Sequence, residues 1–167
     1  TILRYTDGVT RIEPFWNPVT DVAMLDEASA VARLDSLLQR ATKERMVSDV
    51  PLGVFLSGGI DSSTVAYYAA KVSAQQIKTF SIGFSEKSFD ESPAARLVAA
   101  HLGTEHHEQM LSGEDALALV QDIPEVFDEP VADASVLPTL LLSRFTREHV
   151  TVALGGDGAD ELLLGYP

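Results

Sequence analysis

Two glycine-rich segments of this chain combine small residues with side chains that bind phosphate or metal ions. The first, Ser57 to Ser63, reads S-G-G-I-D-S-S, and the second, Gly155 to Glu161, reads G-G-D-G-A-D-E. Glycine lets a ligand approach backbone N–H groups closely, and the beginning of a helix adds positive potential there. Carboxylates beside such a cradle suit a metal ion that accompanies the phosphate. The two segments therefore predict a site for a phosphate-bearing ligand.

The residues around the first segment predict a strand, a sharp turn and a helix. Val50 to Leu56 is a short apolar run, which is typical of a buried parallel strand. Asp61 and the two serines after it favour the N-terminus of a helix that continues to about Ser73. The turn lacks the lysine of the GxxxxGK[ST] phosphate loop. A lone glycine-rich turn also occurs where a strand simply joins a helix, so its local pattern leaves both interpretations open.

The second segment follows another apolar run, Val150 to Leu154, and carries the carboxylates of Asp157, Asp160 and Glu161. Carboxylates beside a polyphosphate require a cation between them, and Mg²⁺ takes one or two carboxylates together with phosphate oxygens and waters. We therefore pair Asp61 with Asp160 as metal ligands. The alternative is that Asp61 only caps a helix and Asp160 is a solvated acid, and spacing alone leaves both open.

The rest of the chain alternates strands with helices, which predicts an α/β fold with a doubly wound, mainly parallel sheet. Ligands of such sheets bind beyond the carboxyl ends of the strands. His106 and His107 are adjacent on an expected strand, so they point to opposite faces and do not suit one metal ion. Helices are expected at 21–46, 64–73, 93–102, 112–121 and 138–148, and strands at 50–56, 78–84, 104–110 and 150–154. Thr6-Asp7-Gly8 marks a turn that makes a hairpin plausible within residues 1–20.

Composition narrows the possible partners and the location. The chain has 167 residues and a formal net charge of −13, which disfavours binding to a nucleic-acid backbone. It contains no run near the roughly 18 apolar residues that a membrane helix needs. It also contains no Cys, which fits a reducing cytoplasm. The chain begins with Thr1 and stops just after a motif, so we expect it to be part of a longer protein.

Five segments in a fixed order carry a resemblance to a known family. The segment at 56–63 resembles the SGGxDS loop of the N-type ATP pyrophosphatases, whose fold is adenine nucleotide alpha hydrolase-like. Together the five resemble the synthetase domain of class B, glutamine-hydrolysing asparagine synthetases and related amidotransferases, including β-lactam synthetases. The resemblance spans roughly residues 15–167. The segments are LSGGIDSS (56–63), FSIGFSEKSFDES (80–92), AAHLGTEHHE (99–108), DEP (128–130) and GGDGADELLLGYP (155–167).

The resemblance implies a site for ATP and Mg²⁺. A substrate carboxylate would attack the α-phosphorus of ATP to give an acyl-adenylate and pyrophosphate, and ammonia would then displace AMP. Asp157, Asp61 and Asp160 would be the catalytic residues, with Mg²⁺ between Asp61 and Asp160. The adenine would lie against the backbone near Leu56 and Ile82. The phosphates would be held by Ser57, Gly58, Gly59, Asp61, Ser62 and Ser63, and the ribose and α-phosphate by Gly155 and Gly156.

The resemblance also implies substrates and missing parts. The expected acceptor is aspartate, which would give asparagine with ammonia from glutamine. Residues 1–20 would be a linker or hairpin from a missing N-terminal glutaminase domain, and residues 21–167 a synthetase domain truncated at its C-terminus. A homodimer is a further expectation. An acidic stretch at 125–133 either borders the site or is solvated surface.

Three positions depart from the family pattern. Gly155, Asp157 and Leu164 stand where the family usually has Ser, Glu and Gly. These departures keep two alternatives open. One is another adenylating amidotransferase of the same superfamily, and the other is a non-catalytic nucleotide-binding fragment.

Overall fold

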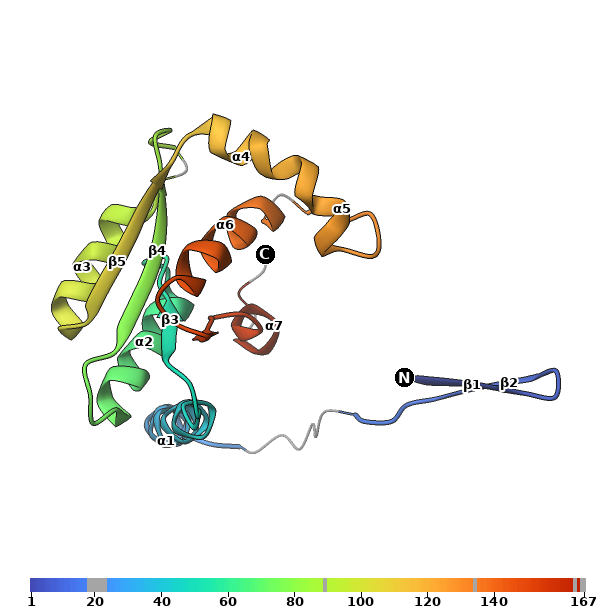
Figure 1. The fold of residues 1–167 in the computed structure, drawn as a ribbon. Coiled ribbons are helices and arrows are strands. Elements are labelled where there is room, and N and C mark those ends of the chain that lie inside the picture. Colours follow the sequence, from blue (N-terminus) through green and yellow to red (C-terminus); the bar gives the residue numbers. More distant parts are fainter. Residues whose placement is uncertain (18–23, 89, 134, 164, 166–167) are drawn as a thin grey trace. The chain divides into compact units, whose positions relative to one another are not determined.

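The computed structural model describes residues 1–17, 24–88, 90–133, 135–163 and 165 (Figure 1). The predictions that fall on 18–23 and on Leu164 lie outside these residues. The chain divides into two compact units, Thr1–Arg33 and Leu34–Pro167. Helix α1 (Glu27–Arg45) begins in the first unit and ends in the second.

The first unit contains the hairpin that the sequence predicts. Strands β1 (Ile2–Thr6) and β2 (Val9–Glu13) pair antiparallel around Asp7 and Gly8. Both turn residues have positive φ, 51° and 78°, which the Asp-Gly pair accommodates and which matches the twist of a tight hairpin. Asp26 then defines the beginning of α1, because its carboxylate accepts the backbone N–H of Ser29 at 2.9 Å. The predicted helix at 21–46 is therefore shorter at its N-terminal end.

The second unit is built on a parallel sheet. Within the described residues its strands are β3 (Leu52–Phe55), β4 (Lys78–Phe84), β5 (Glu105–Leu111) and β6 (Val152–Leu154), in the order β5-β4-β3-β6. All three pairings are parallel, so the carboxyl ends of the strands meet at one edge. The prediction of a mainly parallel sheet is confirmed, although β3 and β6 each begin two residues later than expected.

Helices cover both faces of this sheet (Figure 1). On one face lie α2 (Ile60–Val72) and α3 (Ser92–Leu102), and on the other lies α6 (Val136–Arg147). Helix α3 has Pro93 in its first turn and ends at Gly103 with φ 67°, as the sequence predicts. The remaining helical segments are α4 (Gly113–Leu119), the 3₁₀ turn η1 (Val120–Asp122), α5 (Ile123–Val126) and α7 (Ala159–Leu163). No helix in the described ranges is long and apolar enough to cross a membrane.

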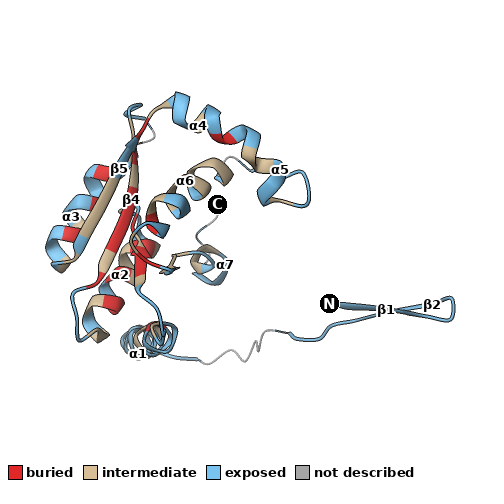
Figure 2. Cartoon of the chain, viewed as in Figure 1, coloured by how far each residue is buried: buried red, intermediate tan, exposed pale blue. Residues whose placement is uncertain are grey.

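The core lies between the sheet and the pair α2 and α3. Val54 and Leu56 pack there against Ala66, Ala69 and Ala95, all of which are almost fully buried. The small alanines let the helices approach the sheet closely, and each large side chain buried in this way stabilises the fold by roughly 2 kcal/mol. Figure 2 shows buried residues concentrated along β4 and on the helix faces next to the sheet.

Three local expectations differ from the structure. The sequence of 123–138, which is rich in acidic residues and carries no helical or strand pattern, predicts a loop, but the structure places α5 and the beginning of α6 there. The apolar side chains of 138–148, which include Leu140, Leu141, Leu142 and Phe145, predict a buried helix. In α6, however, Thr146 is the one buried residue among those described, because only one side of the helix faces the sheet. Finally, α2 is capped by Gly59, with no side-chain cap, whereas Asp61 lies inside its first turn. The expectation that Asp61 and the serines cap this helix is therefore wrong.

Candidate active site

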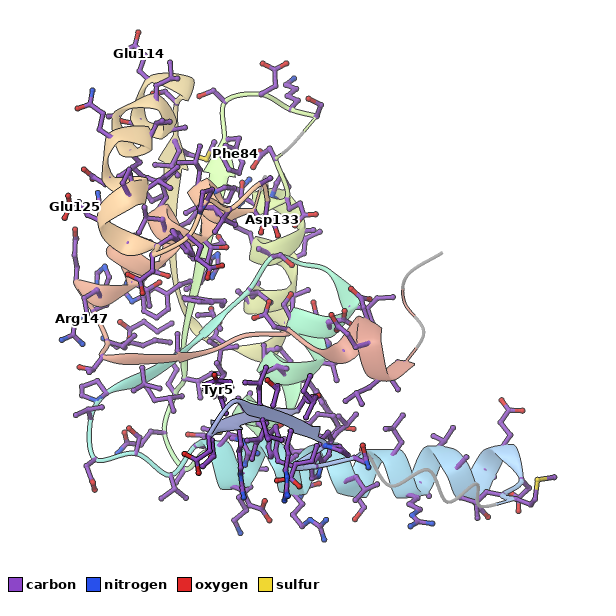
Figure 3. The ribbon with its side chains drawn as sticks, turned by 90° about the vertical axis from the view of Figure 1, so that its right-hand side faces the viewer. Tyr5, Phe84, Glu114, Glu125, Asp133 and Arg147 are labelled. Atoms are coloured by element: carbon purple, nitrogen blue, oxygen red, sulfur yellow. The ribbon has the colours of Figure 1, made fainter. Side chains whose placement is uncertain are left out.

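A cavity of about 480 Å³ opens at the carboxyl ends of the strands. Its size is within the usual range for a site that binds a small molecule or cofactor. Phe84, labelled in Figure 3, lines it at the end of β4. The cavity lies where the sheet topology predicts a ligand.

The structure brings most of the predicted site residues to this cavity. Nine of them line it: Leu56, Ser57, Asp61, Ser62, Ile82, Gly155, Gly156, Asp157 and Asp160. Gly58, Gly59 and Ser63 are not among the described lining residues. Gly59 is the cap of α2, and the hydroxyl of Ser63 is buried without a hydrogen-bond partner among the described residues.

The two glycine-rich turns touch each other. A Cβ added to Gly156 would lie 2.9 Å from the backbone nitrogen of Ser62 and 3.1 Å from the Cβ of Asp61. Real Cβ atoms essentially never approach other atoms within 3.0 Å, so only glycine fits at position 156 without a shift. The contact places the turn after β6 directly on the beginning of α2.

Gly58 fixes the first turn from the opposite side. Its φ is +87°, a conformation that other residues rarely adopt, and a Cβ there would lie 2.6 Å from the Cβ of Ala94 at the start of α3. The SGG turn is thus held between α3 and the turn after β6. Gly58 is needed for the close approach of α3 to this turn, and Gly156 for the close approach of the turn after β6.

The described lining residues give the cavity a strongly acidic wall. They include the carboxylates of Asp61, Glu91, Asp157, Asp160 and Glu161, and they include no Lys, Arg or His. Every charged side chain among the described lining residues is negative, so a polyphosphate entering this cavity requires an accompanying cation.

The donor set fits Mg²⁺ in the way that a nucleotide site requires. Asp61 and Asp160 supply carboxylate oxygens, the ligand type that Mg²⁺ prefers. In the described part of the chain no three His, Cys, Asp or Glu side chains are close enough to hold an ion by themselves. A magnesium ion here would therefore take its other ligands from phosphate and water, which is how it is bound in most phosphate-transfer sites.

Several residues that line the cavity were not predicted from the sequence. Thr139 and Leu142 come from α6, three residues apart and hence on one side of that helix. Glu91 precedes α3 and follows β4, so the rule that ligands bind beyond strand ends would have identified it. Nothing in the local pattern of α6 indicated that it reaches the cavity.

Two other candidate regions lie away from the cavity. The acidic residues at 125–133 are exposed and none is among the described lining residues. Asp133 accepts the backbone N–H of Ser135 at 2.8 Å, which lowers the pKa of its carboxyl group. His106 and His107 point to opposite faces of β5, as predicted. His106 contacts Thr79 on β4, whereas His107 stacks on Phe80.

Comparison with known protein structures agrees with this fold. The glutamine-dependent NAD⁺ synthetase of Acinetobacter baumannii, solved with ADP, matches with a TM-score of 0.55 and 24% identity over 89% of this chain and 29% of that chain. The NMN synthetase of Francisella tularensis matches with a TM-score of 0.53 and 16% identity over 86% of this chain and 59% of that chain. These matches confirm the predicted ATP pyrophosphatase fold.

Sequence comparison identifies closer relatives. A putative glutamine-hydrolysing asparagine synthetase of Methanocaldococcus jannaschii is 40% identical over 154 residues, which cover 92% of this chain and 29% of that protein. Asparagine synthetase 1 of Bacillus subtilis is 36% identical over 160 residues, which cover 96% of this chain and 25% of that protein. The chain thus spans between a quarter and three tenths of the length of these relatives. The family model described as asparagine synthase matches residues 33–167, which include both glycine-rich turns and every strand of the parallel sheet, and the chain therefore belongs to the asparagine synthase family.

Proposed function

We propose that this chain is the ATP-binding part of an enzyme that activates a carboxylate as an acyl-adenylate and converts it to an amide, with aspartate as the acceptor and asparagine as the product. The contact of Gly156 with Asp61 and Ser62 carries this proposal. It joins a backbone cradle for phosphate to carboxylates on a separate turn. A phosphate binder that performs no chemistry has no need of both.

Each part of the cavity has a proposed task. Leu56 and Ile82 line the cavity, and their backbone would hold the adenine between the ends of β3 and β4. The Ser57–Ser63 turn would bind the β- and γ-phosphates, and Gly155 and Gly156 would lie against the ribose and the α-phosphate. Asp61 and Asp160 would hold Mg²⁺, which supplies charge neutralisation for the departing pyrophosphate.

The reaction proceeds in two displacements. An oxygen of the acceptor carboxylate attacks the α-phosphorus, the bond to the bridging oxygen breaks, and pyrophosphate leaves with the electron pair. Ammonia then attacks the acyl carbon and AMP leaves. Orientation and charge stabilisation account for most of the acceleration of such a step, and a rigid turn fixed by two close glycine contacts provides the orientation. Asp157, which lines the cavity, would assist formation of the adenylate.

Further parts of the protein complete the activity. Relatives of this chain are named glutamine-hydrolysing, and they are three to four times longer. We propose that residues 1–20 connect residues 21–167 to a glutaminase domain that releases the ammonia, and that further residues follow Pro167. We also propose that the enzyme acts in the cytoplasm, because a chain without Cys suits a reducing compartment. We propose further that it is a homodimer.

One observation favours a second acceptor. Gly155 and Asp157 are both smaller than the Ser and Glu usual in the family, and both line the cavity. A roomier wall suits an acceptor acid other than aspartate in an otherwise identical adenylating amidotransferase.

Exchange of labelled pyrophosphate into ATP by the full-length protein tests the proposal. A panel of amino acids and other carboxylic acids is added one at a time, because exchange occurs only when the correct acceptor forms an adenylate. Exchange with aspartate supports the first acceptor, and exchange with another acid supports the second. If ATP binds but no acid promotes exchange, the chain is a nucleotide-binding module and the enzymatic proposal is wrong.

A further inference from the structure

The hydroxyl of Ser62 is hydrogen-bonded within the turn that precedes it. Ser62 is the third residue of α2 and only 9% exposed. Its Oγ accepts the backbone N–H of Ser57 at 3.2 Å, lies 2.9 Å from the Oγ of Ser57, and donates to the carbonyl of Gly59 at 3.3 Å. These bonds link the beginning of α2 back to the end of β3.

Counting donors and acceptors shows that the single proton of Ser62 is used within the turn. A serine hydroxyl has one proton to donate and accepts two hydrogen bonds. The Ser62 proton goes either to the Gly59 carbonyl or to the Ser57 hydroxyl, because either serine can be the donor in the bond between them. In both arrangements the Ser62 oxygen also accepts the backbone N–H of Ser57. A phosphate oxygen would have to break one of these bonds to reach it.

Ser57 and Gly59 differ from Ser62 in exposure. Both are exposed, and the backbone N–H of Gly59 donates to the Ser57 Oγ at 3.2 Å. A ligand oxygen can replace that hydroxyl as the acceptor for Gly59 after a simple rotation of the Ser57 side chain. The groups of Ser57 and Gly59 at the surface of the turn therefore suit phosphate, while Ser62 is less exposed than either of them.

We propose that Ser62 is a positioning residue: its hydroxyl holds Ser57 and Gly59 in the shape that binds phosphate before any nucleotide arrives. The resemblance implied only that Ser62 contacts the phosphates. The identity of the ligand rests on the proposed function, whereas the hydrogen bonds of the ligand-free turn do not.

A matched pair of variants isolates the hydroxyl in the full-length protein. Ser62→Thr and Ser62→Val add the same bulk, but only threonine keeps the hydroxyl. We expect amide hydrogen exchange at Ser57, measured without nucleotide, to be at least tenfold faster in the valine variant than in the threonine variant. Exchange at Ser63, whose N–H bonds the Gly59 carbonyl within α2, serves as the internal reference. The dissociation constant for ATP with Mg²⁺, measured by calorimetry, should rise by about tenfold in the valine variant.

The outcomes separate the two roles of Ser62. Equal Ser57 exchange in the two variants, with weaker ATP binding in the valine variant, would mean that Ser62 binds phosphate directly and would overturn the proposal. Equal exchange with equal affinity would overturn it as well. Faster exchange in the valine variant supports the positioning role even if no variant, nor the unmodified protein, binds ATP, and in that case only the proposed function fails.

A smaller substitution covers the case in which neither bulky variant folds. Ser57→Ala removes the hydroxyl that accepts from Gly59 but leaves the bond from the Ser57 N–H to Ser62. We expect Ser57→Ala to accelerate amide hydrogen exchange at Gly59 and to leave exchange at Ser57 unchanged. Ser62→Ala should instead accelerate amide hydrogen exchange at Ser57. The reverse pattern would contradict the proposal.

Discussion

Gly156 and Asp61 lie far apart in the sequence but touch in the fold, so that a Cβ on Gly156 would come within 3.1 Å of the Cβ of Asp61. This contact joins the carboxyl end of β6 to the first turn of α2. It brings the acidic residues after β6 to the same cavity wall as the SGG turn, and the first two predictions depend on it.

Replacing Gly156 with Ala should push the two turns apart. The new Cβ would lie 2.9 Å from the backbone nitrogen of Ser62, and backbone cannot move aside as a flexible side chain can. We expect ATP affinity, measured by calorimetry with Mg²⁺, to fall at least tenfold. Gly113→Ala is the control, because nothing lies within 4 Å of a Cβ at that position. Unchanged affinity in Gly156→Ala would show that the contact has no role in nucleotide binding.

Replacing Asp61 with Asn should remove one proposed magnesium ligand while keeping the size of the side chain. We expect ATP affinity in the presence of Mg²⁺ to fall at least tenfold, and the difference between affinities with and without Mg²⁺ to shrink. Asp49→Asn is the control, because Asp49 is exposed and is not among the described lining residues. Equal affinity with and without Mg²⁺ in the unmodified protein would favour a simple nucleotide binder.

Replacing Tyr68 with Phe should reduce stability without affecting the cavity. Tyr68 is buried on α2, and its hydroxyl donates to the carboxylate of Asp35 on α1 at 2.8 Å. Loss of one such hydrogen bond to a charged group should lower the free energy of unfolding by about 1–2 kcal/mol, measured by urea denaturation. Tyr67→Phe is the control, because Tyr67 is exposed and no hydrogen bond of its hydroxyl occurs in the described structure.

The hydroxyl of Tyr68 should lose its proton only at a higher pH than an ordinary tyrosine. Burial, followed by the hydrogen bond to Asp35, raises the pKa of Tyr68 to about 12. Because the folded protein keeps the proton that the unfolded chain loses above about pH 10, stability should fall as the pH rises from 10 towards 12. Absorbance at alkaline pH should show a late-titrating tyrosine that is absent from Tyr68→Phe. An unchanged titration curve would contradict this assignment.

His106 should make the protein less stable in mild acid. Burial lowers the pKa of His106, which lies on β5 against Thr79 and Ser81 of β4, even though Glu108 on the same strand opposes this change. Just below pH 6.5 the unfolded chain binds a proton that the folded protein does not, so the free energy of unfolding should decrease as the pH falls through this range.

Variants of two histidines check the assignment. In His106→Gln the dependence of unfolding free energy on pH between 7 and 5.5 should become flatter, whereas His101→Gln, at an exposed site on α3, should behave like the unmodified protein. The groups that face His106 are Thr79 and Ser81 on β4 and Glu108 on β5, with Arg96 on α3 paired to Glu108. A slope that persists in His106→Gln would assign the effect to another group.

Features that depend on neighbours in the sequence were predicted well. The pair Ser112 and Asp115, three residues apart at the start of the expected helix 112–121, predicts a capping box. The structure has it at the beginning of α4, with the Ser112 N–H bonded to the Asp115 carboxylate at 2.8 Å. The left-handed Gly103 at the end of α3 and the strand over residues 78–84 also agree with the sequence. Each of these signals lies within a few residues, so tertiary packing had little to change.

The sequence by itself determined the alternation of strands and helices, and hence a parallel sheet with two glycine-rich turns at its carboxyl edge. The roles within those turns were decided by packing between distant segments. Gly59 caps α2 in place of Asp61 and Ser62 bonds Ser57, while Glu91 and Leu142 reach the cavity from other elements. Asp61 and Ser62 can both accept a backbone N–H in an isolated turn, so the local sequence does not tell which of them bonds to the turn. The close approach of α3 to Gly58 and of Gly156 to Asp61 and Ser62 fixes the turn in which both line the cavity and only Ser62 also bonds Ser57.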